Sequence, residues 1–455
     1  MSTGQKRSLG LLQATAINMT DMVGIGPFIT LSLVISMMNG PYFLYAWVAG
    51  AFLSIIDAQV WSELGSAFPK AGGSYNFLME AFGKNKAGKL MSFLFVWQTM
   101  IQAPLVIASA SIGFAYYFSY LVPLSTLSSK LLSGGVVVLI IVLLYRKIED
   151  IGKISVVMWA VVILTLFWII GGGLLHGNFM YPIKHINDGL TLNYAFISAL
   201  GFASVKSVYS YLGYYNICHL GGEIVNPSKN IPKSMILSII GIALLYLMMN
   251  VSVASVIPWE QAKDSKFVIS DYMLKIAGPT AANVITCMVL IVAFASVFSA
   301  TLGYSRVPYA AAADGSFFPV FAKLHPKGNF PYVSLLFIGA VAFVFSLLFK
   351  LSDVISAILA MRILVQFISQ AVGLILLRRK RKSETFPFKM PLFPVPVFLA
   401  IAMWLCILIS TGVNMVLGGL FTTALGATVY FIKAKVNREW PFQQNATLSN
   451  PPEEA

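Results

Sequence analysis

Long apolar segments, separated by short polar and charged stretches, run from near the start of the chain to its last quarter. A membrane-crossing helix needs about 20 mainly apolar residues, and most of these segments reach that length. Their boundaries, taken at charge clusters and at Gly and Pro, predict twelve spans. We expect them at Leu11–Met38, Tyr42–Leu64, Leu90–Tyr117, Leu131–Tyr145, Ile154–Leu175, Tyr194–Val225, Met235–Ile257, Ala281–Tyr304, Tyr332–Phe349, Val354–Leu377, Val395–Met415 and Leu417–Ile432. The pattern therefore predicts an all-α membrane protein with 12 transmembrane helices.

Composition supports this class. Hydrophobic residues make up 58% of the chain and charged residues 11%, whereas an ordinary soluble domain has about 25% charged residues. The first ten residues are polar and basic and run directly into a full-length span, so we expect no cleavable signal peptide. The three cysteines, Cys218, Cys287 and Cys406, form no spacing pattern and predict neither disulfides nor a metal site.

Lysine and arginine predict the orientation of the spans. If both termini are cytoplasmic, the cytoplasmic segments hold 23 of these residues, the external loops hold 6, and Lys206 and Arg362 lie inside spans. Such a bias follows the positive-inside rule. The formal charge of +14 thus reflects topology and attraction to anionic lipid, and it does not indicate nucleic-acid binding. We expect a multi-pass protein of the cytoplasmic (inner) membrane.

Two of the spans are interrupted by residues that disfavour a continuous helix. The first contains GIGPFI, Gly24 to Ile29, and the sixth contains YSYLGY, Tyr209 to Tyr214. Backbone that leaves the helix at membrane depth is tolerated only where protein buries it or where it lines a wet cavity. Breaks in the first and sixth spans are typical of two five-helix units inserted with opposite topology. The two breaks are therefore predicted to form a binding site at mid-membrane.

At these residues the sequence resembles the amino acid–polyamine–organocation superfamily, in particular bacterial permeases related to the L-type and cationic amino acid transporters. GIGPFI stands where the family has a Gly-Ser-Gly-Ile-Phe type of break. Further similar segments are SELGSAFPKAGGSYNFLMEAFG (Ser62–Gly83), YSYLGY with GGEIVNPSKNIP (Tyr209–Pro232), SRVPYAAAADGSFFPVFAKLHP (Ser305–Pro326) and FPFKMPLFPVPV (Phe386–Val397).

The resemblance implies a LeuT-type fold with a 5+5 inverted repeat in which helices 1 and 6 are broken. The implied parts are a cytoplasmic N-terminus (1–10), the first repeat (11–175), the second repeat (190–377), accessory helices 11 and 12 (391–432) and a cytoplasmic tail (433–455). The implied activity is secondary active transport of amino acids by alternating access, either as proton symport or as exchange. No covalent chemistry is involved, so no cofactor is expected, and no partner subunit is implied.

The family also implies a substrate site at the two breaks. The backbone amides of Gly24, Ile25, Gly26 and Phe28 are expected to hold the substrate carboxylate. This chain departs from the family pattern at two places: Ile25 replaces a small hydroxyl residue, and Pro27 has no amide hydrogen. On the sixth span, Tyr209 is expected either to close over the substrate or to pack against neighbouring helices. The remaining candidates from this break are Ser210, Tyr211 and Gly213.

Charged residues inside spans are costly unless they are paired or hydrated, so they are candidates for coupling and gating. These candidates are Asp21, Asp57, Lys206 and Arg362, with Lys153 near the cytoplasmic end of the fifth span. Our hypothesis is that Asp21 and Lys206 bracket the site, and a purely structural network is the alternative. Lys153 either reaches Asp21 or extends to the lipid headgroups. Glu63 and Glu223 are expected to hold the inner gate or helix ends.

Two other functions remain open. Plant polyamine permeases have an acid at the position of Asp57, within IIDAQVWSEL, so the substrate could instead be an amine or polyamine. The protein could also be a sensor that binds amino acids without moving them. An enzyme is disfavoured because the sequence has no Ser/His/Asp set, paired His ligands or Gly-rich phosphate loop.

Overall fold

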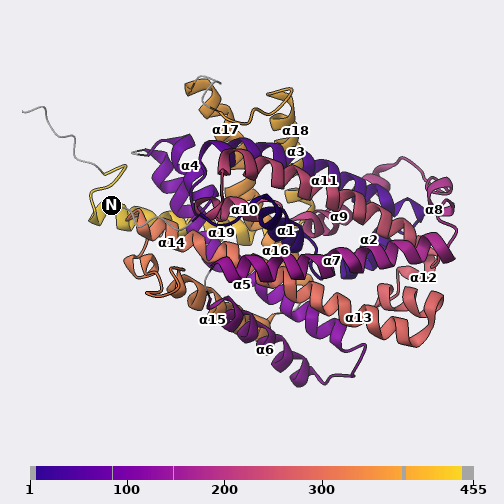
Figure 1. Ribbon diagram of the computed structural model, residues 1–455. Coiled ribbons are helices and arrows are strands. Elements are labelled where there is room, and N and C mark those ends of the chain that lie inside the picture. The colour runs from indigo at the N-terminus through magenta and orange to yellow at the C-terminus, as the bar shows by residue number, and fades with distance from the viewer. Residues whose placement is uncertain (1–6, 85, 147, 350, 382–385, 443–455) are drawn as a thin grey trace, which may run out of the picture.

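The computed structural model describes residues 7–84, 86–146, 148–349, 351–381 and 386–442. Most of the predicted N-terminal segment and the end of the predicted tail, residues 443–455, lie outside this part. Within it the chain is helical and has no strands beyond two isolated bridges, so the all-α prediction is confirmed. The helices of Figure 1 are α1 Leu11–Met22, α2 Gly26–Met38, α3 Leu44–Ala67, α4 Ser74–Phe82, α5 Ala87–Phe118, α6 Thr126–Leu144, α7 Ile148–His176, α8 Tyr181–Lys184, α9 Tyr194–Tyr211, α10 Asn216–His219, α11 Pro227–Ala254, α12 Trp259–Ala262, α13 Val268–Tyr304, α14 Arg306–Ala313, α15 Tyr332–Leu348, α16 Leu351–Arg362, α17 Ile368–Lys380, α18 Val395–Ser410 and α19 Val413–Val436.

Across the described residues, eight helical segments are long and apolar enough to cross a membrane. The pair α1 and α2, bent by 41° at its break, would make a ninth span, and α15 and α18 are shorter apolar helices. The sixth predicted span does not form one continuous helix, because α9 ends at Tyr211 and the chain continues through a turn into the short α10. The chain is therefore a multi-span helical protein.

Two predicted spans differ from the structure. The eighth begins earlier than predicted, at Val268, and α13 bends at Gly278, whose φ of +82° suits a glycine followed by Pro279. The tenth was predicted as one helix, but a five-residue π segment, Ile363–Phe367, separates α16 from α17. A π segment changes which side chains share a face, and hydropathy alone does not reveal it.

Helix α1 lies near the centre of the bundle, where it packs against α7, α11 and α13 (Figure 1). Helix α2 packs against α9, and α3 packs against both α9 and α11. Large aromatic side chains fill the interior, including fully buried Trp47, Trp61 and Trp404. In contrast, α19 exposes Leu417, Phe421 and other apolar side chains, as expected for a helix that faces lipid. The broken helices thus sit inside the bundle.

Ion pairs connect helices and loops at one end of the bundle. Glu63 of α3 accepts two hydrogen bonds from Arg378 of α17, at 2.6 and 2.7 Å, and Glu223 accepts from Arg306 of α14 at 2.9 Å. Glu223 also accepts backbone hydrogen bonds from Ser8 and Leu9 through its carbonyl oxygen. These contacts fasten the loop after α10, the start of the described chain and α17 to the bundle.

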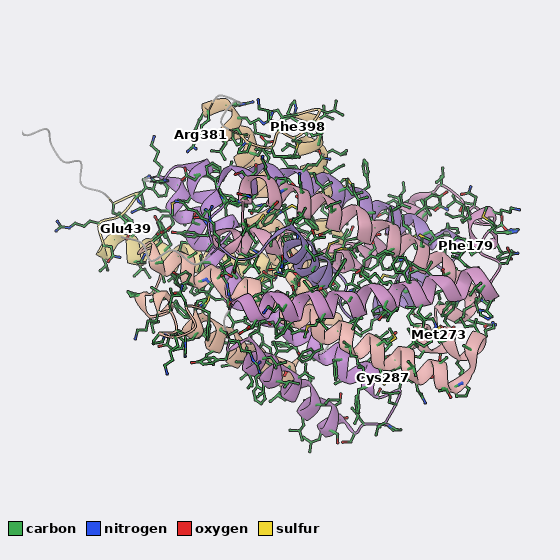
Figure 2. All side chains as sticks on the ribbon, in the orientation of Figure 1. Phe179, Met273, Cys287, Arg381, Phe398 and Glu439 are labelled. Carbon is green, nitrogen blue, oxygen red and sulfur yellow. The ribbon has the colours of Figure 1, made fainter. Side chains whose placement is uncertain are left out.

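A more exposed pair lies at the same end. Figure 2 shows Arg381 and Glu439 toward the end that carries the N label in Figure 1, and Phe179 and Met273 at the opposite end. Glu80 of α4 pairs with Lys84 and Arg381, both at 2.8 Å. Burial by itself would raise the pKa of Glu80, but hydrogen bonds and charges from Lys84 and Arg381 outweigh it and lower that pKa. This carboxylate therefore stays ionised at neutral pH.

Small residues allow α7 and α11 to approach closely, as is common between membrane helices. A Cβ atom added to Gly173 would lie 2.5 Å from the Ser252 Cβ and 2.6 Å from the Ser252 Cα. Gly171, two residues earlier on the same helix, has no atom within 4 Å of that position. The first glycine is thus required by packing, and the second is not.

We predict that Gly173→Ala lowers the thermal unfolding midpoint of the purified protein in detergent, because the added methyl meets the backbone of α11. The expected cost is about 1–3 kcal/mol. The matched control Gly171→Ala should leave the midpoint unchanged or raise it, because alanine has the better helix propensity. Equal midpoints for the two variants would contradict this description of the α7–α11 contact.

Candidate functional site

The break between α1 and α2 leaves three backbone donors unused. Helix α1 ends at Met22, and α2 begins at Gly26 with Pro27 in its first turn. The Gly24 amide donates to the Met22 carbonyl at 3.1 Å. The amides of Ile25, Gly26 and Phe28 donate to no acceptor in the part of the chain that the structure describes. Unpaired amides at a helix N-terminus, together with the helix dipole, favour an anion.

The second break touches the first. After Tyr211 the backbone of Leu212 is extended, and Gly213 has a φ of +123°, a conformation that favours glycine. A Cβ at Gly213 would lie 2.7 Å from the Met22 nitrogen and 2.8 Å from the Asp21 carbonyl carbon. Glycine is therefore needed here both for its dihedral angles and for the close approach of the two backbones.

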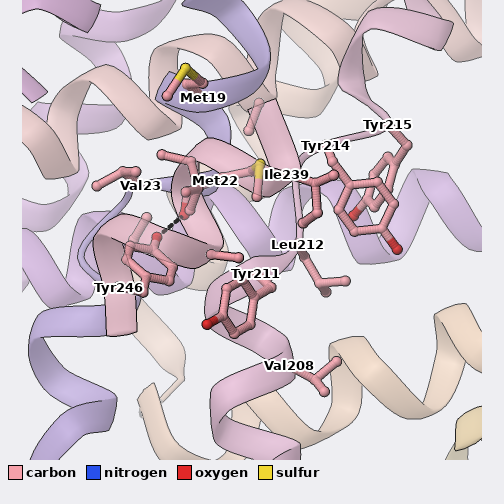
Figure 3. Close-up of a cluster of buried hydrophobic side chains, with 14 of the residues drawn as sticks. Met19, Met22, Val23, Val208, Tyr211, Leu212, Tyr214, Tyr215, Ile239 and Tyr246 are labelled. Atoms are coloured by element: carbon pink, nitrogen blue, oxygen red, sulfur yellow. Dashed lines mark hydrogen bonds between the residues drawn. The ribbon is translucent and has the colours of Figure 1, made fainter. Parts of the chain in front are cut away.

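Hydroxyl groups fix the two breaks against each other. The Thr30 and Ser210 hydroxyls are 2.8 Å apart and join α2 to α9. The Tyr246 hydroxyl of α11 lies 2.8 Å from the Met22 carbonyl oxygen and 3.2 Å from that of Ser210, and Figure 3 marks the first contact with a dashed line. Ser296 of α13 donates to the Asp21 carbonyl at 2.9 Å. These bonds satisfy carbonyl oxygens that the broken helices leave without helical partners.

A small cavity of about 50 Å³ lies between the breaks. This volume holds about four water molecules, at roughly 10–15 Å³ for each. Side chains and backbone from α1, α2, α5, α9, α13 and α16 enclose it. The lining residues are Asp21, Met22, Gly24, Ile25, Gly26, Val106, Ala110, Tyr209, Ser210, Leu212, Gly213, Tyr215, Ser296, Tyr304, Ile358 and Arg362. The cavity is thus polar at the breaks and apolar where α5 and α16 face it.

Most of the residues predicted from the two breaks lie on this cavity. From the first break these are Gly24, Ile25 and Gly26, and from the second Tyr209, Ser210 and Gly213. The Tyr209 hydroxyl reaches across to Ser109 of α5, 3.0 Å away. The side chain of Phe28 is buried elsewhere, and its carbonyl oxygen accepts a hydrogen bond from Tyr117 at 3.1 Å. Tyr211 packs against Trp47 and Tyr246 instead of lining the cavity.

The predicted charges separate into two groups. Asp21 and Arg362 line the cavity, whereas Asp57, Lys206 and Lys153 do not. Lys206 is buried on α9 and donates to Ser356 of α16 at 3.4 Å. Lys153 is exposed on α7. The basic group that shares the cavity with Asp21 is therefore Arg362, not Lys206.

Asp57 of α3 is held by neutral donors. The Tyr214 hydroxyl donates to its Oδ2 at 2.6 Å, and the Trp404 indole of α18 donates to its Oδ1 at 3.0 Å. In Figure 3, Tyr214 and Tyr215 lie on the opposite side of Leu212 from Tyr246. Both carboxylate oxygens of Asp57 are thus engaged in joining the second break to helices α3 and α18.

Three site residues were not predicted from the sequence: Tyr246, Ser296 and Tyr304. Each is a polar side chain within a long apolar span, which is the signal that could have drawn attention to them. Many other serines and tyrosines share that signal, because membrane helices often satisfy hydroxyls on their own backbone. Only the packing of α11 and α13 against the breaks distinguishes these three.

Comparison with known proteins agrees with this arrangement. The model of the amino acid permease family matches residues 9–432, almost the whole described chain. The chain belongs to this family. It is 25% identical to the branched-chain amino acid permease BcaP of Bacillus subtilis, over 94% of this chain and 93% of BcaP. It is also 23% identical to the serine/threonine exchanger SteT of Bacillus subtilis, over 88% of this chain and 90% of SteT.

A human relative shows how widely the family extends. The chain is 24% identical to the human cystine/glutamate transporter, over 94% of this chain and 85% of that protein. Members of the amino acid permease family are transporters, not enzymes, which confirms two predictions from the sequence. The permease is accordingly a multi-span membrane protein whose relatives move amino acids.

We predict that Tyr246→Phe impairs transport by the permease, because it leaves the carbonyl oxygens of Met22 and Ser210 without this donor. A buried acceptor left unpaired costs about 1–3 kcal/mol, so the thermal midpoint should fall together with uptake into proteoliposomes. Tyr211→Phe is the matched control. Its hydroxyl has no hydrogen-bond partner among the described residues, so both quantities should stay near wild type. Wild-type uptake by Tyr246→Phe would show that this link is dispensable.

Proposed function

We propose that the permease carries amino acids across the cytoplasmic membrane by alternating access, with the substrate bound in the cavity between the two breaks. The observation that carries the proposal is the set of unpaired amides at Ile25, Gly26 and Phe28, two of which belong to cavity-lining residues. Since the N-terminus of α2 attracts an anion, it suits the α-carboxylate that every amino acid has.

The ammonium group of the substrate has complementary partners on the same cavity. Asp21 supplies a carboxylate, and the C-terminal ends of α1 and α9, which carry the negative end of the helix dipole, meet at Gly213. A zwitterion can therefore place its negative end at α2 and its positive end at Asp21. In this proposal Ile25 contributes its amide to the site, and its side chain packs toward Gly113 of α5.

The proposed fold has twelve spans in a 5+5 inverted repeat, with residues 11–175 and 190–377 as the repeats and 391–432 as accessory helices. Its support is that the break after α1 and the break after α9 occur in the first helix of each proposed repeat and meet at one cavity. Both termini are proposed to be cytoplasmic, which places the Glu63–Arg378 and Glu223–Arg306 pairs on the cytoplasmic side.

The proposed cycle opens the cavity alternately to each side. Tyr209, which lines the cavity and contacts Ser109 of α5, is proposed to close the path to the outside. The buried pairs Glu63–Arg378 and Glu223–Arg306 are proposed to close the inner path and to separate when it opens. Coupling is proposed to be proton symport or exchange with a second amino acid.

An amine or polyamine substrate has less support. Asp57, the acid that suggested it, does not line the cavity, and both of its oxygens are hydrogen bonded. A long polyamine also has no carboxylate to pair with the amides at α2. The relatives reported above are named for amino acids, which agrees with the main proposal.

We predict that the purified permease in proteoliposomes takes up radiolabelled amino acids, and that Gly24→Val abolishes uptake. A Cβ at Gly24 would lie 2.6 Å from the Ser296 Oγ, so a branched side chain must displace the first break or α13. Gly135→Val on α6, where nothing lies within 4 Å, is the control and should retain most uptake.

Two outcomes of this assay would contradict the proposed function. Tight amino acid binding without flux would identify a sensor. Inhibition or replacement of uptake by putrescine or spermidine, but not by any amino acid, would identify an amine transporter. Imposing a pH gradient, or preloading the vesicles with amino acid, separates proton symport from exchange.

A further inference from the structure

Two opposite charges face the same small cavity without forming an ion pair. Asp21 of α1 and Arg362 of α16 both line it, and no carboxylate oxygen of Asp21 lies within 4.0 Å of an Arg362 nitrogen. The Asp21 carboxylate has no hydrogen-bond partner among the described residues, although Arg362 is close enough to attract it. Each charge therefore keeps free capacity toward the cavity.

The unused capacity is greatest at Arg362. This side chain is 2% exposed, its Nη2 donates to the Tyr304 hydroxyl, and its guanidinium lies over the rings of Tyr215 and Tyr304 at 5.0 and 5.3 Å. Its Nε and Nη1 are buried and have no partner within the described chain. A buried guanidinium that lacks acceptors is unfavourable, and an acceptor with a negative charge compensates it best.

No other ionisable acid or base among the described residues lines the cavity, apart from tyrosine hydroxyls. Helix α5 contributes Val106 and Ala110, and α16 contributes Ile358, one turn before Arg362. These apolar residues offer nothing to the Arg362 donors. The missing acceptor must therefore come from whatever occupies the cavity, or from Asp21 in another conformation.

We propose that the permease selects amino acids with a negatively charged side chain, and that Arg362 is the residue that recognises this charge. The inference rests on the proposed function, in which the amides at α2 hold the α-carboxylate and Asp21 faces the ammonium. With those two groups placed, the side chain of the substrate extends to the free donors of Arg362. The small cavity favours a short side chain, as in aspartate.

The same geometry disfavours other side chains. A neutral aliphatic side chain leaves the Arg362 donors unpaired, and a lysine or arginine substrate brings a like charge beside them. Asparagine has nearly the shape of aspartate but lacks its charge, so comparing the two isolates the electrostatic contribution. This comparison needs no mutation.

The test is binding and uptake by the full-length permease in proteoliposomes, with aspartate, glutamate, asparagine, leucine and lysine as substrates. Wild type is expected to bind aspartate at least tenfold more tightly than asparagine. Arg362→Gln should weaken aspartate binding by roughly 30-fold or more and reduce the aspartate-to-asparagine ratio to near one, because it removes one partner of a buried charge pair. Arg362→Lys should recover part of the ratio.

Lys206→Gln is the matched control, because Lys206 is also a buried base but does not line the cavity. Its aspartate-to-asparagine ratio should equal that of wild type. Wild type that binds asparagine or leucine as tightly as aspartate would overturn the inference whether or not the variants fold. An unchanged ratio in a folded Arg362→Gln protein would overturn it as well and would assign Arg362 to pairing with Asp21. Failure to bind any amino acid would instead refute the proposed function.

Discussion

The central constraint on this permease is the backbone hydrogen bonding that two interrupted helices give up inside an apolar bundle. In hydrocarbon, polar backbone groups need partners from the protein or from a wet cavity. Here the carbonyl oxygens at the breaks receive those partners from Tyr246 and Ser296. The amides at the start of α2 do not, and Ile25 and Gly26 border the cavity. The site consists of what the fold leaves unsatisfied.

Other features follow from holding the breaks together. Gly213 lets the backbone of the second break touch α1, and the Thr30–Ser210 contact fixes α2 to α9. Asp57 fastens Tyr214 to α3 and α18, so a buried acid that resembles a binding group acts on the break from behind. At the end of the bundle, the bidentate Glu63–Arg378 pair joins α3 to α17. Rigid support surrounds a small polar centre.

Glycine and proline at unusual positions were sufficient to predict from the sequence where the first break lies, and most cavity residues on it. The charges show why prediction went no further. Asp57 and Asp21 are both acids within spans, but only Asp21 lines the cavity, because their helices present different faces to it. Lys206 and Arg362 differ in the same way. Tyr246 is distant in sequence from both breaks, so its role depended on tertiary packing that hydropathy does not encode.

The most direct test of the central claim is an experimental structure of the permease with an amino acid bound. The account predicts that a carboxylate of the ligand lies about 2.7–3.2 Å from the backbone nitrogens of Ile25 and Gly26, with α1 and α2 separated as described here. A ligand bound away from these amides, or a continuous helix through residues 11–38, would contradict it.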